Sequence, residues 1–174
     1  MTEFVLTGFM GSGKTTIGRL MAEMLHCPHI DLDEAIVAKA GKSISRIFAE
    51  EGEPYFRDLE TQLLAAAVAR AGILSTGGGT PVRMENNLLL RRIKTPVIFL
   101  ETSPEMILER LKNDRNRPLV QALDPDKLLQ LYRERESCYR QSADFRISTD
   151  RKTPIEIVRE IMERAHISAE DGMH

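Results

Sequence analysis

The sequence predicts an α/β fold in three layers, with a central five-stranded parallel sheet and helices on both faces. Two observations predict it: a glycine-rich loop joins the first strand to the first helix, and strand patterns then alternate with helical patterns. Such alternation is typical of parallel sheets, whose strands are joined by helical crossovers. The predicted strands cover residues 4–9, 29–33, 72–77, 96–101 and 145–150.

Length and composition favour one globular domain. A chain of 174 residues can bury one core but is short for two, and its 42% hydrophobic and 29% charged residues are ordinary for a globular protein. The formal net charge of -2 gives no overall attraction to nucleic acid or to an anionic membrane. No apolar run approaches the roughly 20 residues of a membrane span. We therefore expect a single domain over residues 1–174 that binds neither nucleic acid nor membrane.

Two further features indicate the compartment. The N-terminus leads directly into a strand, without the charged and apolar segments of a signal peptide, which favours the cytoplasm. Cys27 and Cys138 stand far apart and form no metal-ligand pattern. Two reduced thiols are the expected state, with a disulfide or a redox role as the alternative.

The loop after the first strand is the strongest functional motif. Residues 8–15 read Gly-Phe-Met-Gly-Ser-Gly-Lys-Thr, the spacing of a Walker A loop, in which backbone N–H groups at a helix N-terminus bind phosphate. Lys14 is expected to reach the outer phosphates, and the Thr15 hydroxyl to bind Mg2+. A tight turn without a ligand is the alternative, but the complete motif lies between a strand and a helix, as its mechanism requires. The residues expected to bind the nucleotide here are Gly11, Ser12, Gly13, Lys14, Thr15 and Thr16.

The segment after the first helix places two carboxylates at a strand end. Apolar residues at three- and four-residue steps from Ile17 to Leu25 predict that helix, and Pro28 marks the break after it. Asp31 and Asp33 end the strand over 29–33, and residues i and i+2 of an extended chain point to the same side. We expect at least one of them in a ligand cleft at the carboxyl ends of the strands. The alternative is that one of them caps the next helix.

Three helices are predicted next. Gly41 ends a short helix, Ser43 starts another, and a long helix then runs through Ala71. Arg57 on the long helix has two interpretations. The residues alone favour an exposed i,i+3 ion pair with Glu60, worth a few tenths of a kcal/mol. The other interpretation is a binding residue.

Three consecutive glycines, Gly77, Gly78 and Gly79, end the third strand. Such a run is costly in backbone entropy, so we expect close approach of the main chain to another group, with a simple loop as the alternative. Ser75 stands near the position where a P-loop enzyme would carry its Walker B acid, and no acid is present there. A helix over 85–93 follows, before the fourth strand.

The last part of the chain carries two arginine-containing segments. After a helix that opens at Pro104, the basic segment 112–119 is either a solvated loop or a mobile lid that brings arginine onto phosphates. In the helix over 125–140, Arg135 falls on the apolar stripe. Its guanidinium must either reach water or meet a buried anion. The fifth strand and a closing helix from Pro154 complete the chain.

The sequence resembles the shikimate kinase family over residues 2–165. The shared features, in this order, are the phosphate loop, Asp31-Leu32-Asp33, Phe56-Arg57-x-x-Glu60, the triple glycine and Arg117-Pro118-Leu119. The loop alone is common to many nucleotide-binding families, whereas the whole set is specific. The resemblance implies a P-loop NTPase fold like that of nucleoside monophosphate kinases, with a substrate-binding insertion at 34–63 and a lid at 112–124.

The resemblance also implies an activity. The family transfers the γ-phosphoryl group of ATP to the 3-hydroxyl of shikimate, which gives shikimate 3-phosphate and ADP in aromatic amino-acid biosynthesis. In the family, the residue matching Asp33 contacts the ring hydroxyls of the substrate and is the candidate base. The residues matching Arg57 and Arg135 bind the substrate carboxylate, and the backbone of the triplet, at Gly78 and Gly79, contacts the substrate.

On the nucleotide side the resemblance implies that Arg117 is the lid arginine on the phosphates. Thr15 and Asp31 would hold Mg2+, directly or through water. A monomer that uses ATP and shikimate is expected. The candidates for the adenine side are Arg115 and Lys152, and the expected catalytic residues are Lys14, Asp33 and Arg117.

Two other functions remain open from the sequence. A kinase for another small polyol acid such as gluconate, or for a nucleoside monophosphate, fits the phosphate loop and lid but leaves Asp33, Arg57 and Arg135 less explained. A nucleotide-binding regulatory module without phosphoryl transfer is the other. Intact Lys14, Thr15, Asp33 and Arg117 argue against the module, because a degenerate relative would be expected to lose some of them.

Overall fold

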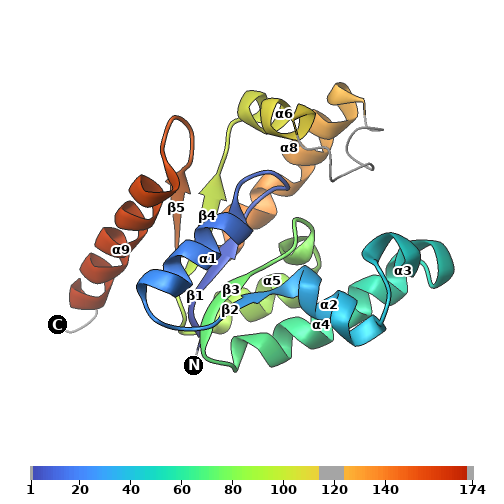
Figure 1. Cartoon of the computed structure of the whole chain (residues 1–174), viewed down its shortest axis with the longest axis horizontal. Helices are drawn as coiled ribbons and strands as arrows, with labels where there is room; N and C mark the ends of the chain where they lie inside the picture. The colour runs from blue at the N-terminus through green and yellow to red at the C-terminus, as the bar shows by residue number, and fades with distance from the viewer. Residues whose placement is uncertain (1, 114–123, 172–174) are drawn as a thin grey trace.

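The five predicted strands form one parallel sheet in the order β2-β3-β1-β4-β5. This computed structural model describes residues 2–113 and 124–171. The strands are β1 (Thr2–Thr7), β2 (His29–Asp31), β3 (Gly72–Ser75), β4 (Val97–Glu101) and β5 (Phe145–Ser148). The first strand lies in the middle of the sheet, so the loop that follows it opens at the centre of the carboxyl edge (Figure 1).

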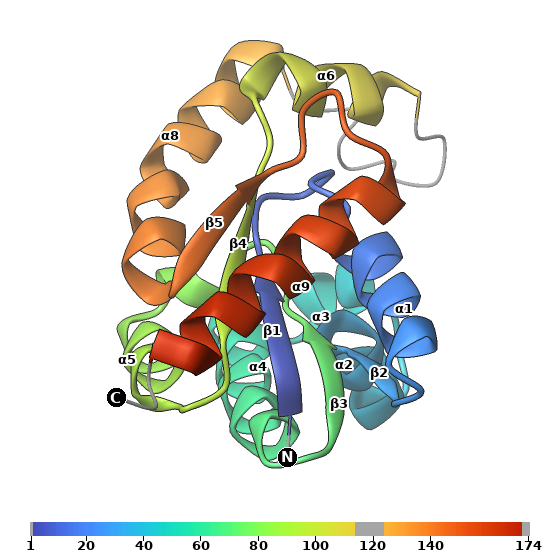
Figure 2. The ribbon, with the colours of Figure 1, turned by 90° about the vertical axis from the view of Figure 1, so that its left-hand side faces the viewer.

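Helices cover both faces of the sheet, which confirms the predicted three layers. Figure 2 shows α9 and α1 in front of the strands and α4 and α5 behind them. The helices are α1 (Lys14–Met24), α2 (Leu32–Ala40), α3 (Ile44–Glu50), α4 (Glu53–Val68), α5 (Met84–Arg92), α6 (Pro104–Lys112), α8 (Pro125–Ser142) and α9 (Pro154–Asp171), with a 3-10 turn, η1, at Thr80–Val82.

The strand β4 explains how the core is divided. Its four residues Val97 to Leu100 are almost completely buried, as the continuous apolar run predicts for a parallel strand. Because successive side chains of a strand alternate in direction, Val97 packs with helices α2 to α5 while Ile98 packs with α1 and α9. Phe99, on the same side as Val97, joins a third cluster with α6 and α8.

The predicted strand over 29–33 is wrong in its last two residues. β2 ends at Asp31, whose side chain accepts a hydrogen bond of 3.1 Å from the Glu34 amide and so caps α2. Asp33 therefore lies in the first turn of a helix, and the extended-chain argument for its direction does not hold. The N-cap alternative is correct, for Asp31.

The two predicted insertions differ in what the structure describes of them. Residues 34–63 form α2, α3 and the first part of α4, with Ser43 capping α3 through a hydrogen bond from the Arg46 amide. The predicted lid at 112–124 falls mostly outside the described residues, since 114–123 are not among them. Cys27 and Cys138 are free thiols, as expected.

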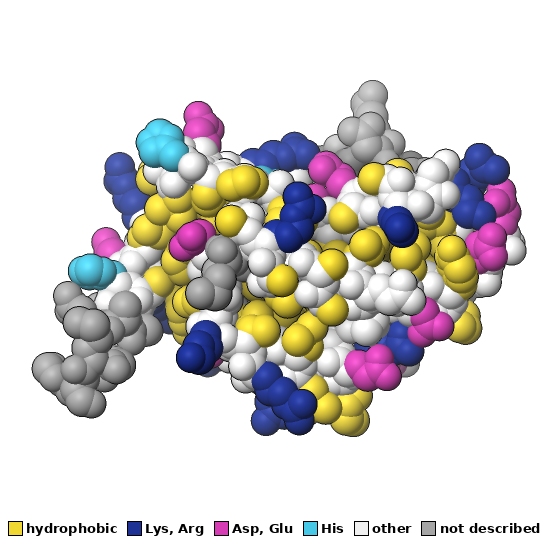
Figure 3. All heavy atoms as spheres, turned by 90° about the horizontal axis from the view of Figure 1, so that it is seen from below, with side chains coloured by type: hydrophobic (Ala, Val, Ile, Leu, Met, Phe, Trp, Pro, Cys, Tyr) yellow, Lys and Arg dark blue, Asp and Glu magenta, His cyan; other side chains and the backbone are white. Residues whose placement is uncertain are grey.

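The face seen in Figure 3 carries basic and acidic side chains interspersed with apolar and uncharged groups. This mixture agrees with the small net charge of the chain. Within 2–113 and 124–171, the helices are too short or too polar to cross a membrane.

Candidate active site

A cavity of about 900 Å3 opens at the carboxyl edge of the sheet, beside the loop after β1. The sequence-predicted site residues that line it are Gly11, Ser12, Gly13, Lys14, Thr15, Thr16, Asp31, Asp33, Arg57, Gly78, Gly79, Arg135 and Lys152. The other two, Arg115 and Arg117, lie outside the described residues. Side chains that are distant in sequence thus meet in one cavity.

The loop after β1 has the backbone of a phosphate-binding turn. Gly11 and Gly13 have φ values of 79° and 92°, a conformation that L side chains rarely adopt. Lys14 is buried, and its Nζ donates to the carbonyls of Gly8 at 2.7 Å and Phe9 at 3.0 Å, so the lysine braces the loop. The Ser12 hydroxyl is buried without a hydrogen-bond partner among the described residues. An anion in the loop would satisfy it.

Thr15 and Asp31 form the pair that could hold a cation. The Thr15 hydroxyl donates to Asp31 Oδ2 at 2.7 Å, while Oδ1 of the same carboxylate caps α2. Hydroxyl and carboxylate oxygens are the hard ligands that Mg2+ prefers. The described residues include no group of three or more His, Cys, Asp or Glu able to hold a metal alone. Magnesium bound here would therefore take its remaining ligands from phosphate and water.

Ser75 lies near the position where other P-loop enzymes carry the Walker B acid, and here it makes structural hydrogen bonds. Its hydroxyl donates to the Lys14 carbonyl at 2.9 Å and lies 2.9 Å from His29 Nε2. Gly18 makes room for this pair, since a Cβ there would lie 2.4 Å from Ser75 Oγ. Burial is the largest effect on His29 and lowers its pKa. A neutral imidazole that donates to Ser75 fits this arrangement.

Each glycine of the triplet lies against one of the predicted substrate-binding side chains. A Cβ on Gly77 would lie 2.8 Å from Asp33 Oδ1, and one on Gly79 would lie 2.6 Å from both terminal nitrogens of Arg57. A Cβ on Gly78 would lie 3.6 Å from a terminal nitrogen of Arg135 and 3.4 Å from the Met10 amide. The close approach predicted from the glycine run is confirmed. The turn brings the three charged groups together.

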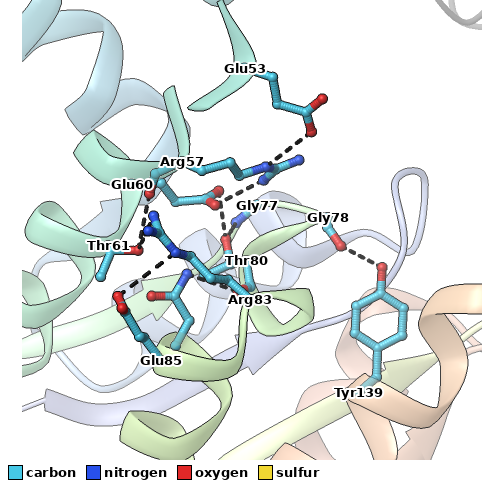
Figure 4. Close-up of polar contacts among 11 residues, drawn as sticks. Glu53, Arg57, Glu60, Thr61, Gly77, Gly78, Thr80, Arg83, Glu85 and Tyr139 are labelled. Atoms are coloured by element: carbon cyan, nitrogen blue, oxygen red, sulfur yellow. Dashed lines mark hydrogen bonds and ion pairs between the residues drawn. The ribbon is translucent and has the colours of Figure 1, made fainter. Parts of the chain in front are cut away.

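Arg57 is held by a buried network that reaches the glycine turn (Figure 4). Its guanidinium pairs with Glu60 at 2.8 Å, and the Glu60 side chain is 1% exposed. The second oxygen of Glu60 accepts a hydrogen bond of 3.1 Å from the Thr80 hydroxyl. The same hydroxyl oxygen accepts a hydrogen bond of 2.9 Å from the Gly77 amide. The i,i+3 pair favoured from the residues alone therefore exists, but its description as exposed is wrong.

Arg135 lines the cavity from α8, with its guanidinium carbon 6.0 Å from the centre of the Phe9 ring. One turn later on α8, the Tyr139 hydroxyl donates to the Gly78 carbonyl at 2.5 Å. Burial raises the pKa of Tyr139, and the charge and hydrogen bond of Arg135 oppose that shift. The positive charge of Arg135 is thus directed to the wall of the cavity, as an anion-binding role requires.

Sequence reasoning missed three polar residues of the site: Glu60 as a buried anchor, Tyr139 and Arg110. Arg110 lines the cavity from α6 and donates to the Gly11 carbonyl at 3.0 Å. The motif Phe-Arg-x-x-Glu was a signal for Glu60, and a tyrosine four residues after Arg135 was one for Tyr139. Arg110 had no comparable signal, because it follows Glu109 and looks like part of the polar face of an ordinary amphipathic helix. Apolar residues that also line the cavity are Ile44, Phe48, Phe56, Leu111 and Ile157.

The arrangement suits the transfer of a phosphoryl group to a small anionic alcohol. One end of the cavity presents a phosphate-binding loop with Lys14, and the glycine turn presents two guanidiniums and the Asp33 carboxylate. Guanidiniums bind carboxylates through paired hydrogen bonds, and a carboxylate accepts hydrogen bonds from hydroxyls.

Comparison with known proteins agrees with this chemistry. The shikimate kinase family model matches residues 10–166. The chain is 43% identical over 163 residues to the shikimate kinase of Sulfurihydrogenibium sp. (strain YO3AOP1), covering 93% of this chain and 96% of that protein. It is 41% identical over 166 residues to the shikimate kinase of Enterococcus faecalis (strain ATCC 700802 / V583), covering 94% of this chain and 98% of that protein.

Solved structures give the same result. A shikimate kinase from Acinetobacter baumannii in complex with shikimate superposes with a TM-score of 0.88 at 35% identity, covering 97% of this chain and 94% of that chain. A gluconokinase from Sinorhizobium meliloti 1021 has a TM-score of 0.63 at 22% identity, covering 99% and 98%, so it shares the fold alone. From the family match, the relatives and the site together, this chain belongs to the shikimate kinase family.

Proposed function

We propose that this protein transfers the γ-phosphoryl group of ATP to the 3-hydroxyl of shikimate, giving shikimate 3-phosphate and ADP in aromatic amino-acid biosynthesis. One observation carries the proposal. Asp33, Arg57 and Arg135 contact the three successive glycines of one turn, in the same cavity as the phosphate-binding loop. In that combination, the arginines can bind an acid, Asp33 can accept hydrogen bonds from its hydroxyls, and the loop can bind a nucleotide in the same cavity.

Arg57 and Arg135 bind the carboxylate of the substrate. Two guanidiniums on one carboxylate offset the cost of removing it from water, because each offers charge-assisted hydrogen bonds. Asp33, beside Gly77, accepts hydrogen bonds from the ring hydroxyls and takes the proton of the attacking one. The apolar side chains of Phe48 and Phe56 cover the ring from α3 and α4.

The nucleotide phosphates bind to the backbone of the loop and to Lys14. Phosphoryl transfer requires little covalent help from the protein, so positioning and charge neutralisation supply most of the acceleration. Thr15 and Asp31 would hold Mg2+, directly or through water, and the cation would neutralise phosphate charge when bound. Arg117, which lies outside the described residues, is proposed to add a second positive charge from a lid that closes over both ligands and excludes water.

The adenine base is proposed to lie where α6 and α9 meet the cavity. The residues that line this part of the cavity are Arg110 on α6 and, at or just before the start of α9, Lys152, Pro154 and Ile157. Lys152 also pairs with Glu160 on α9, which limits its freedom to move. Arg115 stays a candidate outside the described residues. We further propose that the protein is cytoplasmic and acts as a monomer. Sedimentation at micromolar concentration would test the oligomeric state.

A coupled ADP-release assay tests the function. With ATP and Mg2+ present, shikimate is expected to stimulate ADP release, whereas gluconate and nucleoside monophosphates are not. Stimulation by gluconate or a monophosphate, but not by shikimate, would favour a kinase for that acceptor. One ATP bound per chain with no ADP formed with any acceptor would favour the regulatory module.

A further inference from the structure

Tyr139 connects the two parts of the site that the acid must contact. Its hydroxyl donates to the Gly78 carbonyl. Arg135, one turn earlier on α8, lies near the same glycine, since a Cβ on Gly78 would be 3.6 Å from one of its terminal nitrogens. Figure 4 shows the ring reaching from α8 toward the Gly78 carbonyl. The Tyr139 hydroxyl and the Arg135 guanidinium thus both lie at Gly78 of the glycine turn.

Gly78 lies at the junction between the two ligand sites. A Cβ there would lie 3.4 Å from the Met10 amide of the phosphate loop and 3.6 Å from Arg135. A shift of this peptide would therefore change the distance between the phosphates and the acid. Small errors of this kind are costly, because transfer depends on the alignment of the attacking hydroxyl.

The ring of Tyr139 is fixed independently of its hydroxyl. It is 0% exposed and stacks on Phe99 of β4, with ring centres 5.2 Å apart and an interplanar angle of 28°. A phenylalanine in its place would keep this packing and remove only the oxygen. Loss of the hydroxyl would leave the Gly78 carbonyl without this donor.

We propose that Tyr139 is a positioning residue for the acid substrate, whose hydroxyl holds Gly78 and Arg135 in register with each other. The inference rests on the proposed function, since it assigns the residue to the acid half of the same site. The phosphate loop does not depend on this hydroxyl: Lys14 is braced by Gly8 and Phe9, and Thr15 by Asp31. Tyr139 should therefore act on the acid and leave the nucleotide unaffected.

The variant Tyr139→Phe tests this assignment. We expect the KM for shikimate to rise about tenfold, since a buried polar pair loses one partner. The KM for ATP and the affinity for ADP with Mg2+, measured by calorimetry, should stay within about twofold. The melting temperature should change little, because the ring and its stacking on Phe99 remain.

Tyr132→Phe is the matched control. Tyr132 is a second buried tyrosine on the same helix, with its ring edge-on to Phe9 at 5.5 Å. Burial, followed by the charges of Glu136 and Glu101, raises the pKa of its hydroxyl to about 12. The control should keep the KM values for both substrates.

The outcomes separate this assignment from the proposed function. A wild-type chain without shikimate-dependent ADP release would overturn the proposed function and the assignment with it. An active wild type combined with an unchanged shikimate KM in Tyr139→Phe would overturn the assignment alone. Equal losses for ATP and shikimate, or the same loss in Tyr132→Phe, would also overturn it, because they indicate a general structural effect.

Discussion

Ser75 and Lys14 are joined by a hydrogen bond of 2.9 Å from the serine hydroxyl to the lysine carbonyl, so a strand residue holds the first turn of the phosphate-binding helix. His29 Nε2 lies 2.9 Å from the same hydroxyl. The contact ties α1 to β2 and β3 at Lys14, whose ammonium group is proposed to bind phosphate. A neutral hydroxyl thus positions the loop where another P-loop enzyme would place a carboxylate.

Ser75→Ala should weaken nucleotide binding and leave acid binding intact. One buried hydrogen bond contributes about 1 kcal/mol net, which corresponds to about a fivefold rise in the KM for ATP. The KM for shikimate should stay the same, because Arg57 and Arg135 are anchored elsewhere. Steady-state kinetics with each substrate varied would measure the difference.

Ser142→Ala is the control for that variant. Its hydroxyl also donates to a helix carbonyl at 2.9 Å, that of Cys138, but at the far end of α8. It should leave the KM for ATP unchanged. If both serine variants raised the KM for ATP equally, the contact between Ser75 and Lys14 would have no special part in nucleotide binding.

Gly18→Ala should destabilise the fold, although alanine is the better helix former by about 1 kcal/mol. The added methyl would lie 2.4 Å from Ser75 Oγ and 2.6 Å from His29 Nε2, and overpacking of this kind costs about 1–3 kcal/mol. Urea unfolding would measure the change. Combining Gly18→Ala with Ser75→Ala should recover part of the loss. A more stable Gly18→Ala protein would contradict the steric argument.

Local patterns predicted the fold well because each element carries its own signal. Short windows of sequence are enough to predict the four buried residues of β4 and the glycine-rich phosphate loop before α1. The end of β2 was misplaced because Asp31 fits either a strand end or a helix cap, and the hydrogen bond from the Glu34 amide decides between them. Asp33 still lines the cavity, although it does so from a helix.

The buried state of Glu60 could not be predicted from its helix alone. Its second oxygen meets Thr80, twenty residues later, and that contact exists only once β3 lies beside the helix layer. The same holds for Tyr139, whose partner Gly78 is 61 residues away. Sequence patterns predicted most of the charged residues that line the cavity, but not Arg110 or the buried anchor Glu60. The groups that position them, such as Glu60 and Tyr139, depend on contacts between distant segments.

Glu60→Gln should raise the KM for shikimate about tenfold or more. An amide can accept from Thr80, but it then presents its N–H groups to Arg57, so the guanidinium loses a charge-assisted partner worth about 1.5–3 kcal/mol. Glu53→Gln is the matched control. Glu53 also pairs with Arg57, at 3.5 Å, but its side chain is 63% exposed, and exposed pairs contribute less than about 1 kcal/mol. Similar effects of the two variants would show that burial of Glu60 is unimportant.

Two aspartates two residues apart should separate into a nucleotide role and an acid role. Asp33, beside Gly77, is proposed to take the proton of the attacking hydroxyl, and an amide cannot do so. Asp33→Asn should therefore keep the affinity for ATP and abolish phosphorylation of shikimate.

Asp31→Asn should keep the cap of α2, since asparagine is an equally good N-cap, while raising the Mg2+ concentration needed for half-maximal activity. Calorimetry for ATP and a magnesium titration of ADP release would measure both. An Asp33→Asn enzyme with full turnover would exclude Asp33 as the base, and an unchanged magnesium requirement in Asp31→Asn would exclude its part in holding the cation.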